Sequence, residues 1–303
     1  MKPRFLIAAP QYSHQAGGIM ALHNLCDMLN RQGFEAAIVF FHSGKAPNFQ
    51  WGYSNGPELY NPAHQHYHLS LDDGDGAGSA RDFLENGIVV YPDLIPDNPL
   101  GARRVVRYIL CHNLNYQTQQ DEYVLSFSRM FIDGAHGYLY QNFVDPNMHA
   151  RGARHWSERT MDLTYFGKGP SFINCMRIPD TLMLTRSWPE DKNQLGILLR
   201  QCRYMFSWDS VSQTNNDAVA CGAVPVLIHD RQTTLEALAR GEPGAYPPVG
   251  LPNLLDRESV VGEPAAIDAA MAAMGAKVDY YIESWPERVR AFALDAGRHF
   301  QLL

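Results

Sequence analysis

Two acidic residues frame a polar loop in the C-terminal half of the chain. Seven residues separate Asp209 from Asp217, and the sequence continues after Asp217 as Ala-Val-Ala-Cys-Gly-Ala-Val-Pro-Val. Thr214, Asn215 and Asn216 are residue types that cap helices, so they predict a helix with Asp217 in its first turn. The free N–H groups at such a helix end bind anions, and a carboxylate beside them can accept hydrogen bonds from sugar hydroxyls. The same pattern also suits an ordinary capped helix that binds no ligand.

Two cations lie at the predicted ends of neighbouring strands. Lys168 stands between two glycines after a strand predicted at 163–166, and Arg186 follows a strand predicted at 181–185. Ligands of open α/β sheets bind at the carboxyl ends of the strands. Fixed cations there can stabilise a leaving diphosphate without a metal. Either cation alone would be read as an ordinary surface charge.

The N-terminal half offers a glycine pair and a histidine. Gly17 and Gly18 follow a strand predicted at 5–9 and open a helix, and their lack of side chains lets a phosphate or an acceptor approach the backbone. His112 directly follows a strand predicted at 105–111. That histidine could face a bound sugar, or it could serve as a core or capping residue.

Three other clusters of polar residues are weaker candidates for a binding site. The run 64–68 places three histidines on one side of an extended segment, where they could chelate a metal, but a solvated strand face is favoured. The acidic run 72–75 is favoured as a glycine-rich loop. The arginines of 103–107 could meet an anionic acceptor or a membrane surface, although a solvated element end is favoured. The sequence therefore predicts no metal site.

Strands and helices alternate in two successive cycles, with a break near residue 150. This order predicts an α/β protein with two Rossmann-like domains facing a cleft. We expect an N-terminal domain over 1–150 and a C-terminal domain over 151–285. A closing helix over 286–303, whose apolar residues Val289, Phe292, Ala296 and Phe300 share a face, is expected to pack back on the first domain.

Composition narrows the class of protein. A net charge of −7 over 303 residues argues against a protein that coats nucleic acid, whose footprint would be basic. The five cysteines form no CxxC pair, which fits a reducing cytoplasm and disfavours a disulfide framework or a zinc site. No apolar run approaches the ~20 residues that a membrane span needs. We expect a soluble cytoplasmic protein with at most peripheral membrane contact.

Taken together, these motifs resemble those of GT-B glycosyltransferases. The nearest match is the retaining EX7E type, which includes transferases of polysaccharide biosynthesis. The resemblance rests on the double glycine after the first strand, the Gly-Lys-Gly element at 167–169 and the acidic motif at 209–217. The segments 98–108 and 185–189 resemble polysaccharide-locus transferases of this fold. The family normally carries Glu at both acidic positions, and here both are Asp.

The resemblance implies a function and a set of roles. It implies transfer of a hexosyl or related group from a nucleotide-sugar to a hydroxyl of a glycan, lipid-linked or other acceptor. The reaction would be retaining and would need neither a metal nor a cofactor. His112 and Asp209 would lie close to the donor sugar as catalytic residues, and Asp217 would accept hydrogen bonds from the ribose hydroxyls. The donor would be bound by Gly17, Gly18, Lys168, Arg186, Thr214, Asn215, Asn216 and Asp217.

Other functions remain open on the sequence. A nucleotide-sugar epimerase shares the two-domain fold. A non-catalytic nucleotide-sugar or glycan-binding protein would explain the exchange of both Glu for Asp. A DNA glucosyltransferase of the kind that some phages carry also shares the fold, and the acidic net charge places it behind the others.

Overall fold

A computed structural model describes most of the chain and divides it into two compact units. The described residues are 2–13, 16–43, 50–51, 64, 68–72, 74, 76–111, 119, 121–129, 131–142, 145, 147–167, 178–185, 187–209, 212–227, 249–250 and 264–303. The first unit comprises Met1–Gln141 together with Ser284–Leu303, and the second comprises Asn142–Glu283.

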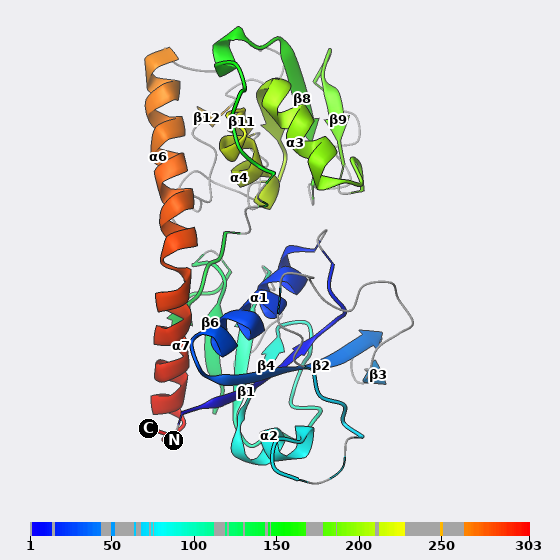
Figure 1. Ribbon diagram of the computed structural model, residues 1–303, viewed down its shortest axis with the longest axis vertical. Helices are drawn as coiled ribbons and strands as arrows, with labels where there is room; N and C mark the ends of the chain where they lie inside the picture. The colour runs from blue at the N-terminus through cyan, green and yellow to red at the C-terminus, as the bar shows by residue number, and fades with distance from the viewer. Residues whose placement is uncertain are drawn as a thin grey trace. The chain divides into compact units, whose positions relative to one another are not determined.

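The first unit is built on a mostly parallel sheet (Figure 1). Its strands lie in the order β3-β2-β1-β4-β5-β6-β7. All its pairs are parallel except β2 with β3. The strands are β1 (Arg4–Ala9), β2 (Glu35–Ser43), β3 (Gln50–Trp51), β4 (Ile88–Pro92), β5 (Val105–Ile109), β6 (Tyr123–Ser126) and β7 (Gly137–Tyr138). The strand order reverses between β1 and β4, as it does in doubly wound folds.

Helices cover both faces of this first sheet. They are α1 (Gly17–Arg31), α2 (Ala80–Asn86) and α7 (Trp285–His299). Leu6 and Ala8 of β1 share a core cluster with Phe83 of α2, whereas the Phe5 ring lies 5.8 Å from the Phe292 ring of α7. Successive residues of a strand point to opposite faces, so a nearly continuous apolar strand such as β1 is suited to a sheet buried on both sides. The C-terminal helix therefore completes the core of the first unit.

The second unit has a smaller parallel sheet in the order β12-β11-β10-β8-β9. Its strands are β8 (Met161–Tyr165), β9 (Leu182–Leu184), β10 (Cys202–Ser207), β11 (Val224–Leu227) and β12 (Val249–Gly250). The helices are η1 (Trp156–Glu158), α3 (Lys192–Gln201), α4 (Gln213–Ala220) and α6 (Pro264–Glu283). Met205 belongs to a core cluster with residues of α3 and α4, and Phe206 belongs to one with residues of η1 and α6. Both faces of this sheet are therefore covered, and the predicted α/β class is confirmed.

Among the described residues, every helix is too short or too polar to span a lipid bilayer.

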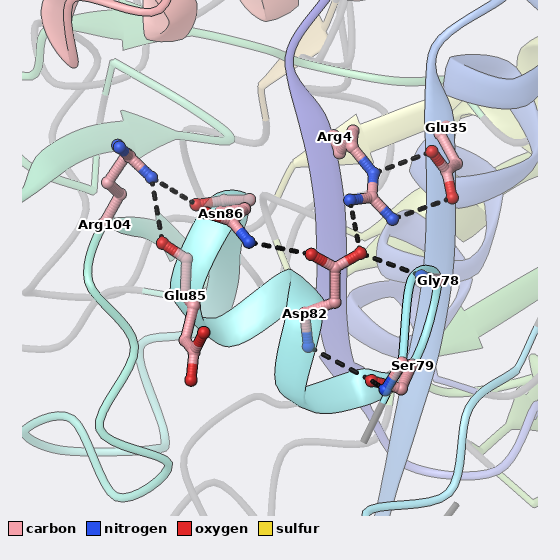
Figure 2. Close-up of polar contacts among 10 residues, drawn as sticks. Arg4, Glu35, Gly78, Ser79, Asp82, Glu85, Asn86 and Arg104 are labelled. Atoms are coloured by element: carbon pink, nitrogen blue, oxygen red, sulfur yellow. Dashed lines mark hydrogen bonds and ion pairs between the residues drawn. The ribbon is translucent and has the colours of Figure 1, made fainter. Parts of the chain in front are cut away.

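A charged network ties α2 to the amino ends of β1 and β2 (Figure 2). Arg4 Nη1 lies 2.7 Å from Asp82 Oδ2, and Arg4 Nε lies 2.7 Å from Glu35 Oε2. The Gly78 amide donates to Asp82 Oδ2 at 2.8 Å, and the Ser79 hydroxyl caps α2. The Gly78 amide and the Arg4 guanidinium lower the pKa of Asp82. Because the network lies at the starts of the strands, it is a stabilising feature at the edge opposite to the strand ends where ligands bind.

Asp82→Asn should cost about 1 kcal/mol of unfolding free energy at neutral pH, because a charge-assisted contact is lost from a partly exposed site. The folded-state pKa of Asp82 lies below its unfolded value. Its contribution is therefore complete above the unfolded pKa of about 3.9 and declines as the pH falls toward the folded value. Urea unfolding of wild type and variant at pH 7 and at pH 3 measures the difference. Asp133→Asn, at an exposed position, is the control, and an Asp82 difference that is equal at both pH values would contradict the assignment.

Candidate functional site

The carboxyl edge of the second sheet gathers two helix starts and two strand ends. The order of the strands reverses between β8 and β10, because β9 lies on one side of β8 and β10 on the other. β9 leads to α3 and β10 leads to α4, so both helices begin at this edge. In open α/β sheets a ligand binds outside the carboxyl ends of the strands at such a reversal, near helix N-termini.

Asp209 and Gly167 lie against each other at this edge. Asp209 follows β10 and is 8% exposed, and Gly167 follows β8 with a φ of +53°. A Cβ added to Gly167 would overlap the Asp209 carboxylate and would lie 2.8 Å from the ring of Tyr165. The structure therefore brings the first acid of the motif next to the glycine that precedes Lys168.

The helix of the acidic motif begins earlier than the sequence predicted. Its N-cap is Ser212, whose hydroxyl accepts the Thr214 amide at 3.2 Å and donates to the Tyr165 hydroxyl at 3.0 Å. The expectation that Asp217 lies in the first turn was wrong, because serine caps as well as asparagine or threonine do and here it precedes them. Thr214 and Asn215 consequently lie in the first turn, and Asp217 lies in the second.

Asn215 ties the start of α4 to the preceding loop. Its Nδ2 donates to the backbone oxygen of Asp209 at 2.9 Å. Its Oδ1 is buried without a hydrogen-bond partner among the described residues, as is Nε1 of Trp208. A buried polar atom without a partner is costly and marks a place that a ligand or water can satisfy.

Asp217 is fully buried and its two oxygens are occupied by side chains. Oδ2 accepts from Lys192 Nζ at 2.9 Å, and Oδ1 accepts from Gln213 Nε2 at 3.1 Å. Burial raises the pKa of this carboxyl, and the nearby Lys192 ammonium opposes that shift. The structure thus turns Asp217 toward Lys192, the first residue of α3.

Lys192 was missed by the sequence analysis. Its side chain is 26% exposed, and its ammonium is held by the fully buried Asp217. The helix macrodipole disfavours a cation at a helix start. A lysine directly after the N-cap residue Asp191 is therefore unusual, and this position could have marked Lys192 as a candidate functional residue. Its partner lies 25 residues further along the chain, which the sequence pattern did not reveal.

In the first unit, the glycine pair lies beside the segment that follows β5. α1 begins at Gly17, and its N-cap, Ala16, offers no side-chain hydrogen bond. A Cβ on Gly18 would lie 3.7 Å from Leu110, whereas one on Gly17 would meet nothing within 4 Å. The start of α1 is therefore close to the carboxyl end of β5, just before His112.

Asp93 joins the ends of β4 and β5 and was also missed. It is 5% exposed, its Oδ1 accepts the Leu110 amide at 2.9 Å, and its Oδ2 accepts from Cys111 Sγ at 3.0 Å. A carboxylate directly after a fully buried strand was the available sequence signal. It places a buried acid at the carboxyl edge of the first sheet.

Several predicted residues cannot be located by the structure. Lys168, Arg186 and His112 lie outside the described residues, as does His66 of the histidine run. Within the described part of the chain, no group of three His, Cys, Asp or Glu side chains could hold a metal ion.

The basic cluster at 103–107 is not a single solvated surface, so that favoured interpretation was wrong for one member. Arg107 is 1% exposed and pairs with Glu122 at 2.5 Å inside the sheet. Its Nη2 also donates to the Asp97 backbone oxygen at 2.5 Å. The central position of Arg107 in β5, with a buried partner on the segment before β6, explains its burial. Through its bond to Asp97, Arg107 fixes the loop after β4, which begins with Asp93.

Comparison with known proteins identifies the fold. The structure is similar to the DNA-modifying enzyme β-glucosyltransferase, solved with and without its substrate uridine diphosphoglucose, with a TM-score of 0.50 and 11% identity over 97% of this chain and 99% of that one. A variant of the phage T4 β-glucosyltransferase in complex with UDP-glucose gives a TM-score of 0.51 at 10% identity over the same shares. No protein-family model and no curated protein matches the sequence. The predicted GT-B architecture of two Rossmann-like domains is therefore confirmed at the level of fold.

Gly167→Ala should destabilise the second unit by about 1–3 kcal/mol, since the new Cβ would both strain the backbone and displace Asp209. Gly152→Ala is a matched control in the same unit. Its φ is +75°, and an added Cβ would meet nothing within 4 Å, so it carries the backbone strain alone, about 1 kcal/mol. Chemical denaturation of the two variants measures the difference, and equal losses would show that Asp209 does not press against Gly167.

Proposed function

We propose that this protein is a glycosyltransferase that moves a sugar from a nucleotide-sugar to an acceptor hydroxyl. The observation that carries the proposal is the Lys192 ammonium, held at the carboxyl edge of the second sheet by the fully buried Asp217. The fold is also that of two glucosyltransferase structures whose described ligand is UDP-glucose. The second unit would bind the donor, and the first unit would bind the acceptor.

The chemistry of a diphosphate suits this arrangement. The Asp217 carboxylate restricts Lys192 to one position, so little freedom is lost when the ammonium meets a phosphate oxygen. The first-turn amides of α3 and α4 that the caps Asp191 and Ser212 do not bind lie at the same edge and can donate to an anion there. An anion would also offset the unfavourable position of a cation at a helix start. Lys192 would therefore stabilise the nucleoside diphosphate as the glycosidic bond breaks.

The other predicted residues keep their proposed roles. Lys168 and Arg186 would add positive charge around the diphosphate, and Asp209 and His112 would act at the donor sugar. We propose that Asp217 contributes to donor binding through Lys192 instead of contacting ribose directly, because both of its oxygens are occupied. The remaining donor-binding candidates are Gly17, Gly18, Thr214, Asn215 and Asn216.

The stereochemical course and the acceptor are part of the proposal. A retaining, metal-independent transfer to a glycan or lipid-linked acceptor follows the sequence resemblance. An inverting transfer would instead need a general base near the acceptor hydroxyl, and Asp93 is a carboxylate at the carboxyl edge of the first sheet. The anomeric configuration of the product, measured by proton NMR with and without a chelator, distinguishes these courses.

Transfer to DNA is a second candidate. The acidic net charge disfavours it, whereas the fold is similar to that of a DNA-modifying glucosyltransferase. An acceptor panel that includes duplex DNA with hydroxymethylated bases, beside saccharides and lipid-linked sugars, separates the two.

Lys192→Gln should weaken nucleoside diphosphate binding about 10-fold or more, because a charge-assisted hydrogen bond is typically worth ~1.5–3 kcal/mol. Asp217→Asn should weaken binding in the same direction, since Lys192 loses its anchor. Calorimetric titration with UDP measures both, after a thermal-shift screen of nucleoside diphosphates and nucleotide-sugars has identified the preferred base.

Lys277→Gln is the control for a general charge effect, because Lys277 is an exposed cation on α6 of the same unit. It should bind the nucleotide as the wild type does. Unchanged affinity in Lys192→Gln would remove the observation on which the proposed function rests.

A further inference from the structure

A cavity of about 140 Å³ lies in the first unit, beside the outer edge of β2. Val39 and Phe40 of β2 contribute one wall, Trp51 of β3 contributes another, and residues 68–72 complete the lining. None of these residues is one of the candidate site residues described above, so the cavity is a separate feature of the first unit.

The pairing of β2 explains where this cavity forms. Leu69 donates its amide to the Ile38 oxygen at 2.9 Å, next to the bridge between Ile38 and His68. Further along the strand, Phe41 pairs with Trp51. The cavity is lined by the two residues between these points, Val39 and Phe40. The strand that contains Trp51 and the segment that begins at His68 are thus both paired with β2. These pairings fix the spacing between the walls of the cavity.

The lining combines aromatic surface with a polar rim. The Phe40 and His68 rings lie 6.0 Å apart, and the Trp51 ring packs 6.1 Å from Phe41. Ser70 and the exposed Asp72 supply a hydroxyl and a carboxylate. Among the described residues that line the cavity, Asp72 is the one acidic residue and none is a lysine or an arginine. This described part of the lining favours a ligand that donates hydrogen bonds over a phosphate.

We propose that this cavity binds one pyranose ring of the acceptor. A dry cavity of about 150 Å³ can hold a benzene molecule, so the volume suits a single six-membered ring. The C–H face of a pyranose can pack on Trp51, whose side chain is only partly buried, and the hydroxyls of the sugar can donate to Asp72. A purely apolar ring would leave this carboxylate unused. The inference rests on the proposed function and specifies its acceptor as a saccharide.

Ring contacts connect the cavity to the carboxyl edge of the first sheet. Phe40 lies 6.2 Å from His23 of α1, and His23 lies 5.4 Å from Tyr12 in the segment after β1. His23 Nε2 donates to the Pro10 oxygen at 2.8 Å, and burial lowers the pKa of His23 to about 4, so the ring is neutral at pH 7. A saccharide held in the cavity would thus lie close to the carboxyl end of β1, because Phe40 is the register partner of Ala9.

The test uses saturation-transfer difference NMR of the full chain with methyl glycosides of glucose, galactose, mannose and N-acetylglucosamine. At least one should bind, and its affinity should fall about fivefold or more in Asp72→Asn and in Trp51→Leu through loss of a hydrogen bond or of the packing face. Asp72 is exposed, so Asp72→Asn should fold normally. Asp133→Asn is the control and should bind as the wild type does.

Calorimetry with UDP on the same samples separates this inference from the proposed function. UDP should bind the wild type and both cavity variants equally. UDP binding without any glycoside signal, or a glycoside signal that neither variant changes, would overturn the cavity assignment alone. Binding of cytidine or thymidine that Trp51→Leu abolishes would overturn it in favour of a nucleobase. Absence of UDP binding with an Asp72-dependent glycoside signal would instead contradict the donor site and leave the cavity as a glycan site.

Discussion

The contact between Lys192 and Asp217 is the interaction on which the second unit's candidate site depends. A carboxylate without solvent exposure is strongly destabilising unless it is paired and hydrogen-bonded. Asp217 satisfies this requirement only with a cation from the start of α3 and an amide from its own helix. The pair therefore joins the starts of α3 and α4 at one edge of the sheet. The same contact orients an ammonium at that edge, and we propose that this ammonium binds the diphosphate of a donor.

The surrounding residues reinforce this edge through close packing. Gly167 has no side chain at the point where Asp209 lies, and Asn215 binds the backbone of Asp209 from the first turn of α4. Buried polar side chains hold the corresponding edge of the first unit. Asp93 joins the ends of β4 and β5, and Arg107 fixes the loop after β4. In both units a buried polar side chain sets the position of the segment that follows a parallel strand. Such positions are where α/β folds place their ligands.

The sequence predicted the fold better than it predicted the site. Apolar runs such as β1 and β4, together with the glycines after β1 and β8, were sufficient to indicate parallel sheets. Asp209 and the Gly-Lys-Gly element were each predicted to follow a strand, and the structure added the contact between Asp209 and Gly167. Three features depended on partners distant in the sequence: the contact of Lys192 with Asp217, the burial of Arg107 by Glu122, and the role of Asp93. Local sequence patterns carry no information on such pairings. The start of α4 was predicted too late because Thr214, Asn215 and Asn216 are also good capping types, whereas the N-cap is Ser212.

The central claim is that Asp217 acts on the donor through Lys192, and a double-mutant cycle for UDP binding tests it most directly. The wild type, Lys192→Gln, Asp217→Asn and the double variant are titrated with UDP under one set of conditions. If Asp217 works by orienting Lys192, the double variant should bind no more weakly than Lys192→Gln, with a coupling free energy of ~1 kcal/mol or more. If the two losses add, the residues act on the nucleotide independently, and the account of this site is contradicted.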